Sequence, residues 1–418
     1  MLALGIDIGT SGVRTAVVEG ERLVSMARSE HPPQDPAKID AMGWWQAVEQ
    51  CLSRQMSALK ELGIDPSAIS GVAVDGTSGT MVLTDRDLTP VSPGLMYNSG
   101  GFDTEANQIA ALVDGPHITL GSNSALARAM RLVALSEGSP AHLLHQADFI
   151  AAKIMGQGGQ SDFNNALKTS FDPKTESWPA WIDQVIDPGL LPRVNNPGSP
   201  MGPIAQEVSE KFGLSADLMV HAGTTDSIAA FLACAPMEEG VAVTSLGSTL
   251  AIKLLSAKRI DDPGVGLYSH RLGDLWLVGG ASNTGGAVLK QHFTDEQLRT
   301  LSNLIDPHSP TGLDYYPLAG PGERFPINDP NLPPRLHPRP EDQVTFLQAM
   351  LEGMAAIEAR CYEEISTRGG SAPTRIYTAG GGAKNAKWTA IRALSLGQTP
   401  VTSKSDEASI GVAKLARN

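Results

Sequence analysis

The chain has 418 residues, of which 41% are hydrophobic and 18% are charged. This length suits two or three domains and is enough to bury a sizeable core. The 45 acidic and 32 basic side chains give a formal net charge of −13, which argues against a general binder of nucleic acid or of anionic membranes. Turn amides can still hold a phosphate within an acidic protein.

The cysteines and the N-terminus indicate the compartment. Cys51, Cys234 and Cys361 are odd in number and far apart, so they predict neither a disulfide framework nor a zinc site and favour a reducing environment. No apolar run reaches membrane-spanning length. The N-terminus lacks the basic start and apolar middle of a signal peptide. We therefore expect a soluble, cytoplasmic protein.

The first residues predict a hairpin. Apolar residues alternate along Leu2–Ile8, which predicts a strand with Asp7 on the face opposite to them. A tight polar turn, Gly9–Gly12, separates this strand from a second β-rich run, Val13–Val18. A helix over Gly43–Leu62 follows.

A buried strand, Ile69–Val74, comes next and ends in the turn Asp75–Thr80. The segment Gly189–Gly202 is then rich in Pro and Gly, and a second Pro-rich stretch, Pro317–Pro340, predicts an extended loop.

The second half repeats the same order of elements. Val241–Thr244 and Leu250–Leu255 predict strands on either side of the glycine turn Ser245–Thr249. Arg375–Thr378 predicts a later strand that leads into the small-residue turn Ala379–Asn385. Each half thus has a hairpin followed by a strand that ends in a small-residue turn. This indicates a duplicated architecture of α/β layers.

One helix between these strands has a clear apolar stripe, which we interpret as core packing. The stripe consists of Leu347, Met350, Leu351, Met354 and Cys361.

The glycine turns at strand ends suit a nucleotide, because their amides can converge on phosphate oxygens without obstruction by side chains. Gly381 and Gly382 leave room for a base or ribose. Asn385 would hydrogen-bond that base, and Trp388 would pack on it.

Two aspartates suggest phosphoryl-transfer chemistry. Asp7 stands before the first turn, where a carboxylate could hold Mg²⁺ through water. Asp226 stands before an apolar helix. Its local sequence leaves two interpretations open, either a helix-capping acid or a general base that accepts a proton from a substrate hydroxyl.

Together, motifs from one end of the chain to the other resemble the FGGY family of carbohydrate kinases. The motifs are DIGTSGVR (Asp7–Arg14), AGTTDSIAA (Ala222–Ala230), TSLGST (Thr244–Thr249), YYPLAGPGERFPINDP (Tyr315–Pro330), LEGMAAIEAR (Leu351–Arg360), TAGGGAKNAKW (Thr378–Trp388) and EASIGVAKLA (Glu407–Ala416). The short branch that resembles D-ribulose kinases is the most similar.

The resemblance implies an α/β fold with two ribonuclease H-like (actin-like ATPase) domains and a cleft between them. Residues 1–230 would form the N-terminal domain, which binds the sugar and carries the first phosphate loop. Residues 231–418 would bind the nucleotide, and the last helix is a candidate to pack back on the first domain. ATP and Mg²⁺ are the implied cofactors.

The resemblance also implies site residues. Asp226 would be the catalytic base, and Asp7 would be a catalytic residue and the metal ligand. The phosphate and adenosine loops would contribute Gly9, Thr10, Ser11, Gly247, Ser248, Thr249, Gly381, Gly382, Asn385 and Trp388. The sugar would contact Ser11, Thr77, Ser78, Asn98 and Asp226.

The chain departs from larger family members near the sugar. Tyr97–Gly101 lacks the acid and arginine that glycerol and xylulose kinases usually carry there, and Asp75–Gly79 replaces a glutamine–methionine–histidine patch of xylulose kinases. Small polar groups would suit the hydroxyls of an open-chain ketopentose.

We therefore expect ATP-dependent phosphorylation of a small ketose, D-ribulose to D-ribulose 5-phosphate, with D-xylulose kinase as the alternative. An actin-like conformational module and an inactive kinase homologue are alternatives of another class. The expected partner is a small-molecule sugar, without nucleic acid or membrane, for a monomer or homodimer.

Overall fold

The computed structural model describes residues 1–36, 38–115 and 117–417. They form two compact units: Met1–Ala233 together with the C-terminal segment from Glu407, and Cys234–Asp406. The sequence-based division into domains of residues 1–230 and 231–418, with the last helix as a candidate to pack on the first, stays a prediction. No helix in these described ranges combines the length and the apolar character needed to cross a membrane.

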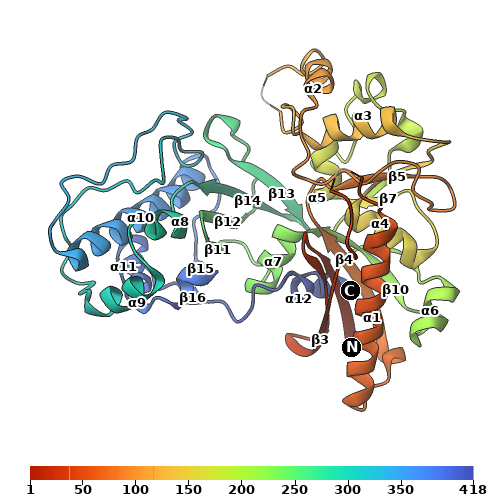
Figure 1. Ribbon diagram of the computed structural model, residues 1–418, viewed down its shortest axis with the longest axis horizontal. Coiled ribbons are helices and arrows are strands. Elements are labelled where there is room, and N and C mark those ends of the chain that lie inside the picture. Colours follow the sequence, from red (N-terminus) through yellow and green to blue (C-terminus); the bar gives the residue numbers. More distant parts are fainter. Residues whose placement is uncertain (37, 116, 418) are drawn as a thin grey trace. The chain divides into compact units, whose positions relative to one another are not determined.

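The first unit is built on a six-stranded mixed sheet (Figure 1). Its strands, in spatial order, are β3 (Arg22–Glu30), β2 (Gly12–Glu19), β1 (Leu2–Ile8), β4 (Ile69–Gly76), β10 (Met219–Thr225) and β9 (Pro200–Pro203). β1 pairs antiparallel with β2 and parallel with β4, and β10 continues parallel to β4. Both faces of β1 are buried, so its apolar residues are not confined to one face and Asp7 is buried too.

The unit also contains helices, only some of which pack against this sheet, and two short two-stranded sheets. The helices are α1 (Met42–Glu61), α2 (Asp103–Ala110), α3 (Ala125–Leu135), α4 (Gln146–Met155), α5 (Phe163–Ala166), α6 (Gln206–Phe212), α7 (Asp226–Cys234) and α12 (Ala408–Ala413). The short sheets pair β5 (Met81–Thr84) with β6 (His142–His145) and β7 (Gln160–Asp162) with β8 (Arg193–Asn195).

The C-terminal helix α12 packs directly on the N-terminal strands of the first unit (Figure 1). A Cβ atom on Gly5 would lie 1.9 Å from the carbonyl oxygen of Ser409, so glycine permits this close approach. On the other side, the buried face of α1, including Trp44 and Val48, joins the same core as Leu4 and Ile6.

The second unit has its own six-stranded sheet. In spatial order its strands are β13 (Tyr268–Leu272), β14 (Leu275–Ser282), β12 (Leu250–Ser256), β11 (Val241–Leu246), β15 (Arg375–Ala379) and β16 (Val401–Thr402). An antiparallel set, β11, β12 and β14, is followed by the parallel strands β15 and β16. The same arrangement occurs in β1, β2, β3, β4 and β10, so the duplication predicted from the sequence is confirmed at the level of topology.

The helices of the second unit include the predicted apolar stripe. They are α8 (Gly286–Lys290), α9 (Asp295–Leu304), α10 (Gln343–Thr367) and α11 (Ala386–Leu396). All five stripe residues of α10 are fully buried in the core of this unit, which confirms the prediction. The Pro-rich segment 317–340 has neither helix nor strand. Cys51, Cys234 and Cys361 are buried and form no disulfide bond within the described residues.

Candidate active site

A row of polar residues crosses the first sheet where β1, β4 and β10 end. Asp7 on β1 lies directly opposite Arg14 on β2 and opposite Asp75 on β4, and Asp75 in turn lies opposite Thr224 on β10. Residues paired in this way share one face of a sheet. The fold therefore brings Asp7 and Asp75, which are far apart in the sequence, side by side.

The two aspartates of this row are buried together. Asp7 is 5% exposed and Asp75 is fully buried. Burial raises the pKa of Asp7, although the contacts with Asp75 and Arg14 oppose that change; Arg14 Nη1 lies 3.4 Å from Asp7 Oδ2.

Asp75 experiences the stronger effect. Burial raises the pKa of Asp75 well above its ordinary value, and the negative charges of Asp7 and Asp226 raise it further. Both carboxylate oxygens of Asp75 lack a hydrogen-bond partner within the described residues. A proton or a cation at this point would relieve the repulsion among the three acids.

Asp226 is the first residue of α7, directly after β10. Its Oδ1 accepts a hydrogen bond from the backbone amide of Ser227 at 2.6 Å. Asp226 directly follows Thr225, which pairs with Gly76, the neighbour of Asp75, and the negative charge of Asp226 raises the pKa of Asp75. The helix-start position is therefore observed, and the role of general base stays a prediction.

The first glycine turn, between β1 and β2, exposes Thr10 and Ser11. The amide of Gly9 donates to the carbonyl oxygen of Gly12 at 3.0 Å. The imidazole of His31 donates from Nε2 to the carbonyl oxygen of Gly9 at 2.8 Å. His31, which the sequence-based predictions did not include, thus stabilises the turn through a hydrogen bond from a residue outside it.

The equivalent turn of the second unit, between β11 and β12, is also open. Gly247, Ser248 and Thr249 are all exposed. The amides at the start of α8, those of Gly286 and Ala287, donate to the carbonyl oxygens of Gly247 and Ser248 at 2.9 and 3.0 Å. Hydrogen bonds to its carbonyl oxygens therefore fix the position of this turn.

The small-residue turn after β15 lies against the β11–β12 turn. Gly380 has φ +83°, and a Cβ atom there would lie 2.7 Å from the carbonyl oxygen of Leu246. A Cβ on Gly382 would lie 2.6 Å from the ring of Trp388, whereas nothing lies within 4 Å of one on Gly381. The glycines thus let two predicted nucleotide loops meet while leaving open space at Gly381.

Asn385 and Trp388 do not lie as we expected for residues that contact a base. Asn385 is the N-cap of α11: its Oδ1 accepts from the amides of Lys387 and Trp388, and its Nδ2 donates to Ser302. Trp388 is 3% exposed and belongs to the hydrophobic core. The indole therefore supports Gly382 and does not offer an open face.

A buried ion pair stabilises both loops of the second unit, and sequence reasoning missed it. Glu358 on α10 and Arg392 on α11, both fully buried, form two hydrogen bonds of 2.6 and 2.7 Å. Arg392 also donates to Thr378 on β15, and Thr244 on β11 donates to Glu358. The sequence does contain a signal for this ion pair: Glu358 and Arg392 each occupy a position on the apolar face of its helix, where a charged residue is unusual.

The predicted sugar residues differ in accessibility. Thr77 is 4% exposed, and its hydroxyl bonds Gln146 Oε1 and the hydroxyl of Thr80, both at 2.7 Å. Ser78 is half-buried and Asn98 is exposed. Thr77 therefore organises its own turn, and Ser78 and Asn98 have the more accessible side chains.

The acidic row fits a hydrated magnesium ion. Carboxylate oxygens are hard ligands, and Asp75 offers two such oxygens without protein donors. Within residues 1–36, 38–115 and 117–417 no three His, Cys, Asp or Glu side chains are arranged to hold a metal ion by themselves. An ion here would therefore need water or phosphate ligands as well. Asp75, which the sequence indicates only as the first residue of a turn, is a candidate member of such a site because the fold places it beside Asp7.

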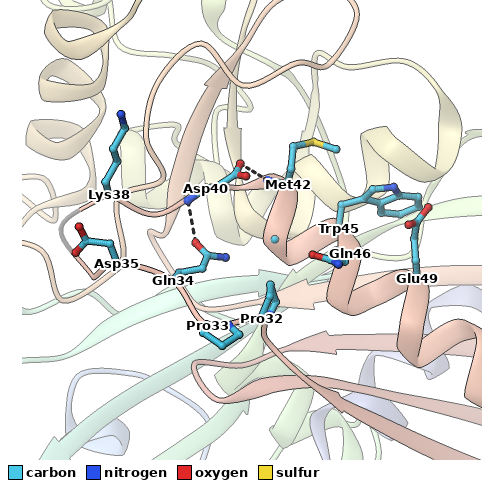
Figure 2. A pocket seen from close by; sticks show the side chains of 11 residues that line it. Pro32, Pro33, Gln34, Asp35, Lys38, Asp40, Met42, Trp45, Gln46 and Glu49 are labelled. Carbon is cyan, nitrogen blue, oxygen red and sulfur yellow. Dashed lines mark hydrogen bonds between the residues drawn. The ribbon is translucent and has the colours of Figure 1, made fainter.

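A surface hollow of about 530 Å³ lies elsewhere in the first unit, between the end of β3 and α1 (Figure 2). Two hydrogen bonds of Asp40 shape its rim, one between its amide and Gln34 and one between its carboxylate and the amide of Met42. None of the residues that line it is a predicted site residue.

The chain belongs to the FGGY family of carbohydrate kinases. Residues 2–123 match the N-terminal domain of this family, and residues 242–417 match its C-terminal domain.

Relatives and solved structures extend over nearly the whole chain. The xylulose kinase of Staphylococcus xylosus is 23% identical over 97% of this chain and 87% of its own length. The xylulose kinase of Streptomyces rubiginosus is 26% identical over 99% of this chain and 87% of its own. The crystal structure of a "xyloylose kinase" from Brucella ovis superposes with a TM-score of 0.85 at 19% identity, over 99% of this chain and 90% of that chain. This last likeness concerns the fold.

Proposed function

We propose that this carbohydrate kinase transfers the γ-phosphoryl group of ATP to a pentulose, with D-xylulose as the leading acceptor. The observation that carries the proposal is the match to curated xylulose kinases along almost the full chain. This order reverses the sequence-based expectation, which placed D-ribulose first.

In this proposal the loops of the second unit hold the nucleotide. The amides of the exposed residues Ser248 and Thr249 would bind phosphate oxygens, because that of Gly247 already donates to the carbonyl oxygen of Thr249. The open space at Gly381 would admit the adenosine moiety. Trp388 supports that loop from below through Gly382. The exposed turn Gly9–Ser11 of the first unit would contact the transferred phosphate.

The first unit would supply the acid–base chemistry. Asp226 would orient the acceptor hydroxyl and take its proton as the oxygen attacks phosphorus. Asp7 and Asp75 would hold Mg²⁺ through water molecules, and this ion would neutralise charge on the phosphate oxygens. Ser78 and Asn98 would hydrogen-bond acceptor hydroxyls.

D-Ribulose is the second candidate acceptor because of a specific feature. The turn Asp75–Thr80 replaces the bulky patch of xylulose kinases with small polar residues. A pocket that hydrogen-bonds each hydroxyl discriminates against an acceptor that lacks one of them.

A coupled ADP-release assay with D-xylulose, D-ribulose, L-ribulose and glycerol tests the proposal. We expect the largest kcat/KM with a pentulose, little activity with glycerol, and a loss of pentulose use in Ser78→Ala with the KM for ATP unchanged. Sugar-independent ATP hydrolysis would indicate a conformational ATPase. Absence of turnover with every acceptor would indicate an inactive homologue.

A further inference from the structure

Arg128, on α3 of the first unit, is 1% exposed and bonds the carbonyl oxygens of three separate chain segments. It donates to Gly79 at 2.6 Å, to Tyr97 at 2.7 Å and to Ser99 at 3.0 Å. It also donates to Asn123 at 3.1 Å, just before its own helix. Two of these segments are the turn Asp75–Thr80 and the loop Tyr97–Gly101, which we call the acceptor loops.

The guanidinium group of Arg128 has no carboxylate partner in the described part of the chain. Burial alone lowers the pKa of Arg128, to about 10, and no nearby acid opposes that change. Arg131, three residues further along α3, instead forms two hydrogen bonds with Glu105. A buried cation costs free energy unless its donors are satisfied. At Arg128 the carbonyl groups of Gly79, Tyr97, Ser99 and Asn123 accept from the two terminal nitrogens, whereas Nε has no hydrogen-bond partner within the described residues.

The two acceptor loops are also bonded to each other. The hydroxyl of Thr80 accepts a hydrogen bond from the amide of Tyr97 at 2.9 Å. Gly79 has φ +83°, and a Cβ atom there would lie 3.1 Å from Arg128 Nη1. Each loop therefore has a defined backbone position relative to the other, and Ser78 and Asn98 extend from these backbones.

We propose that Arg128 is a positioning residue for acceptor binding: it joins the two acceptor loops through their carbonyl oxygens and so fixes the distance between the groups that hold the sugar hydroxyls. This inference rests on the proposed function, because it assigns the acceptor to these loops. A lysine at position 128 keeps the charge but cannot present the planar set of donors that spans Gly79, Tyr97 and Ser99. Small displacements of binding groups reduce rates strongly.

The test is a steady-state comparison of wild-type chain, Arg128→Lys and the matched control Arg131→Lys, with D-xylulose and MgATP each varied. We expect Arg128→Lys to raise the KM for the pentulose at least about 10-fold, with the KM for ATP changed by less than about 2-fold. Arg131→Lys should leave both KM values near those of the wild type, because its ion pair contacts neither acceptor loop. The melting temperature of each variant is measured in parallel.

A second variant covers the case in which Arg128→Lys does not fold. Thr80→Val removes the acceptor for the Tyr97 amide and leaves Arg128 in place, so it should raise the pentulose KM in the same selective way. An unchanged pentulose KM in either folded variant, with only a lower melting temperature, overturns the positioning role and leaves the proposed function intact. A wild-type chain that phosphorylates no acceptor overturns both.

Discussion

The central strands of the two units have the same arrangement, but the charged residues lie at different distances from the glycine turn that joins the first two strands of each unit. In the first unit the row that pairs Asp7 with Asp75 lies one pair away from the glycine turn, with Ile8 and Gly76 in between, and the row behind it pairs the apolar residues Ile6 and Val74. In the second unit the corresponding row pairs Ser245 with Ala379.

The row behind Ser245 and Ala379 contains Thr244 and Thr378, which the buried ion pair of Glu358 and Arg392 holds in place. At these rows the first unit thus has acids near the glycine turn, and the second unit has its charges one row further into the core.

This difference indicates a division of labour. Carboxylates beside a turn can attract a cation and a proton, which suits transfer chemistry. A neutral edge beside exposed amides suits a polyanion such as ATP, because carboxylates there would repel it. The internal ion pair then fixes the two strands from which the nucleotide loops emerge. Under the proposed function, the same fold would serve two tasks through side chains one row apart.

The largest expected effect tests whether the first unit carries the chemistry. Asp226→Asn should lower kcat by about 10²–10⁴-fold, because the amide cannot take the acceptor proton. The KM for ATP should stay near that of the wild type. The neighbouring variant Ser227→Ala serves as the control. A near-normal kcat together with a lower melting temperature would show that Asp226 only stabilises the start of α7.

The next effect concerns the internal charges of the second unit. Glu358→Gln leaves the buried Arg392 without its anion and should destabilise this unit by about 3–5 kcal/mol. Urea unfolding followed by tryptophan fluorescence measures the loss. Glu364→Gln, on the same helix but partly exposed, should cost far less. Equal costs for the two variants would show that the buried pair has no special role.

The comparison is tested directly by giving the first unit the residues that the second unit has at the corresponding row. Asp7→Ser combined with Asp75→Ala gives the first unit the residues of the second, so the sheet should still form. Affinity for Mn²⁺ in the presence of ATP, measured by electron paramagnetic resonance, should fall by at least about 10–100-fold. Unchanged Mn²⁺ affinity would remove the acidic row from metal binding.

The smallest effect concerns a second buried acid pair, Asp148 and Asp162, in the first unit. Burial raises the pKa of both, that of Asp162 to about 6. Because the folded state retains protons that the unfolded state loses near pH 4, this contribution to stability is full below that pH, and the part due to Asp162 is lost as pH rises through about 6.

The melting temperature of the wild type should therefore fall between pH 5 and pH 8. In Asp148→Asn this fall should be smaller by a few degrees. The exposed variant Asp217→Asn should keep the wild-type pH dependence. A pH dependence of Asp148→Asn identical to that of the wild type would contradict the buried-pair explanation.

The sequence determined the elements and the class of protein. Apolar runs bounded by glycine turns located β1, β2, β11, β12 and β15, because strand periodicity and turn chemistry are local properties. The spacing of apolar residues on α10 identified its buried face. The ordered motifs gave the FGGY carbohydrate kinase family, although D-ribulose was placed ahead of the D-xylulose that the named relatives favour.

Only the tertiary structure decided which polar residues work together. Asp75 joins Asp7 through the parallel register of β1 and β4, and this pairing has no local sequence signal. Trp388 is a core residue beneath Gly382, and Thr77 bonds within its own turn. Arg128 appears in the sequence as one of two arginines on an otherwise apolar helix, and its acceptors are backbone carbonyl groups. Because carbonyl groups are common to all residues, no side-chain pattern could reveal that contact.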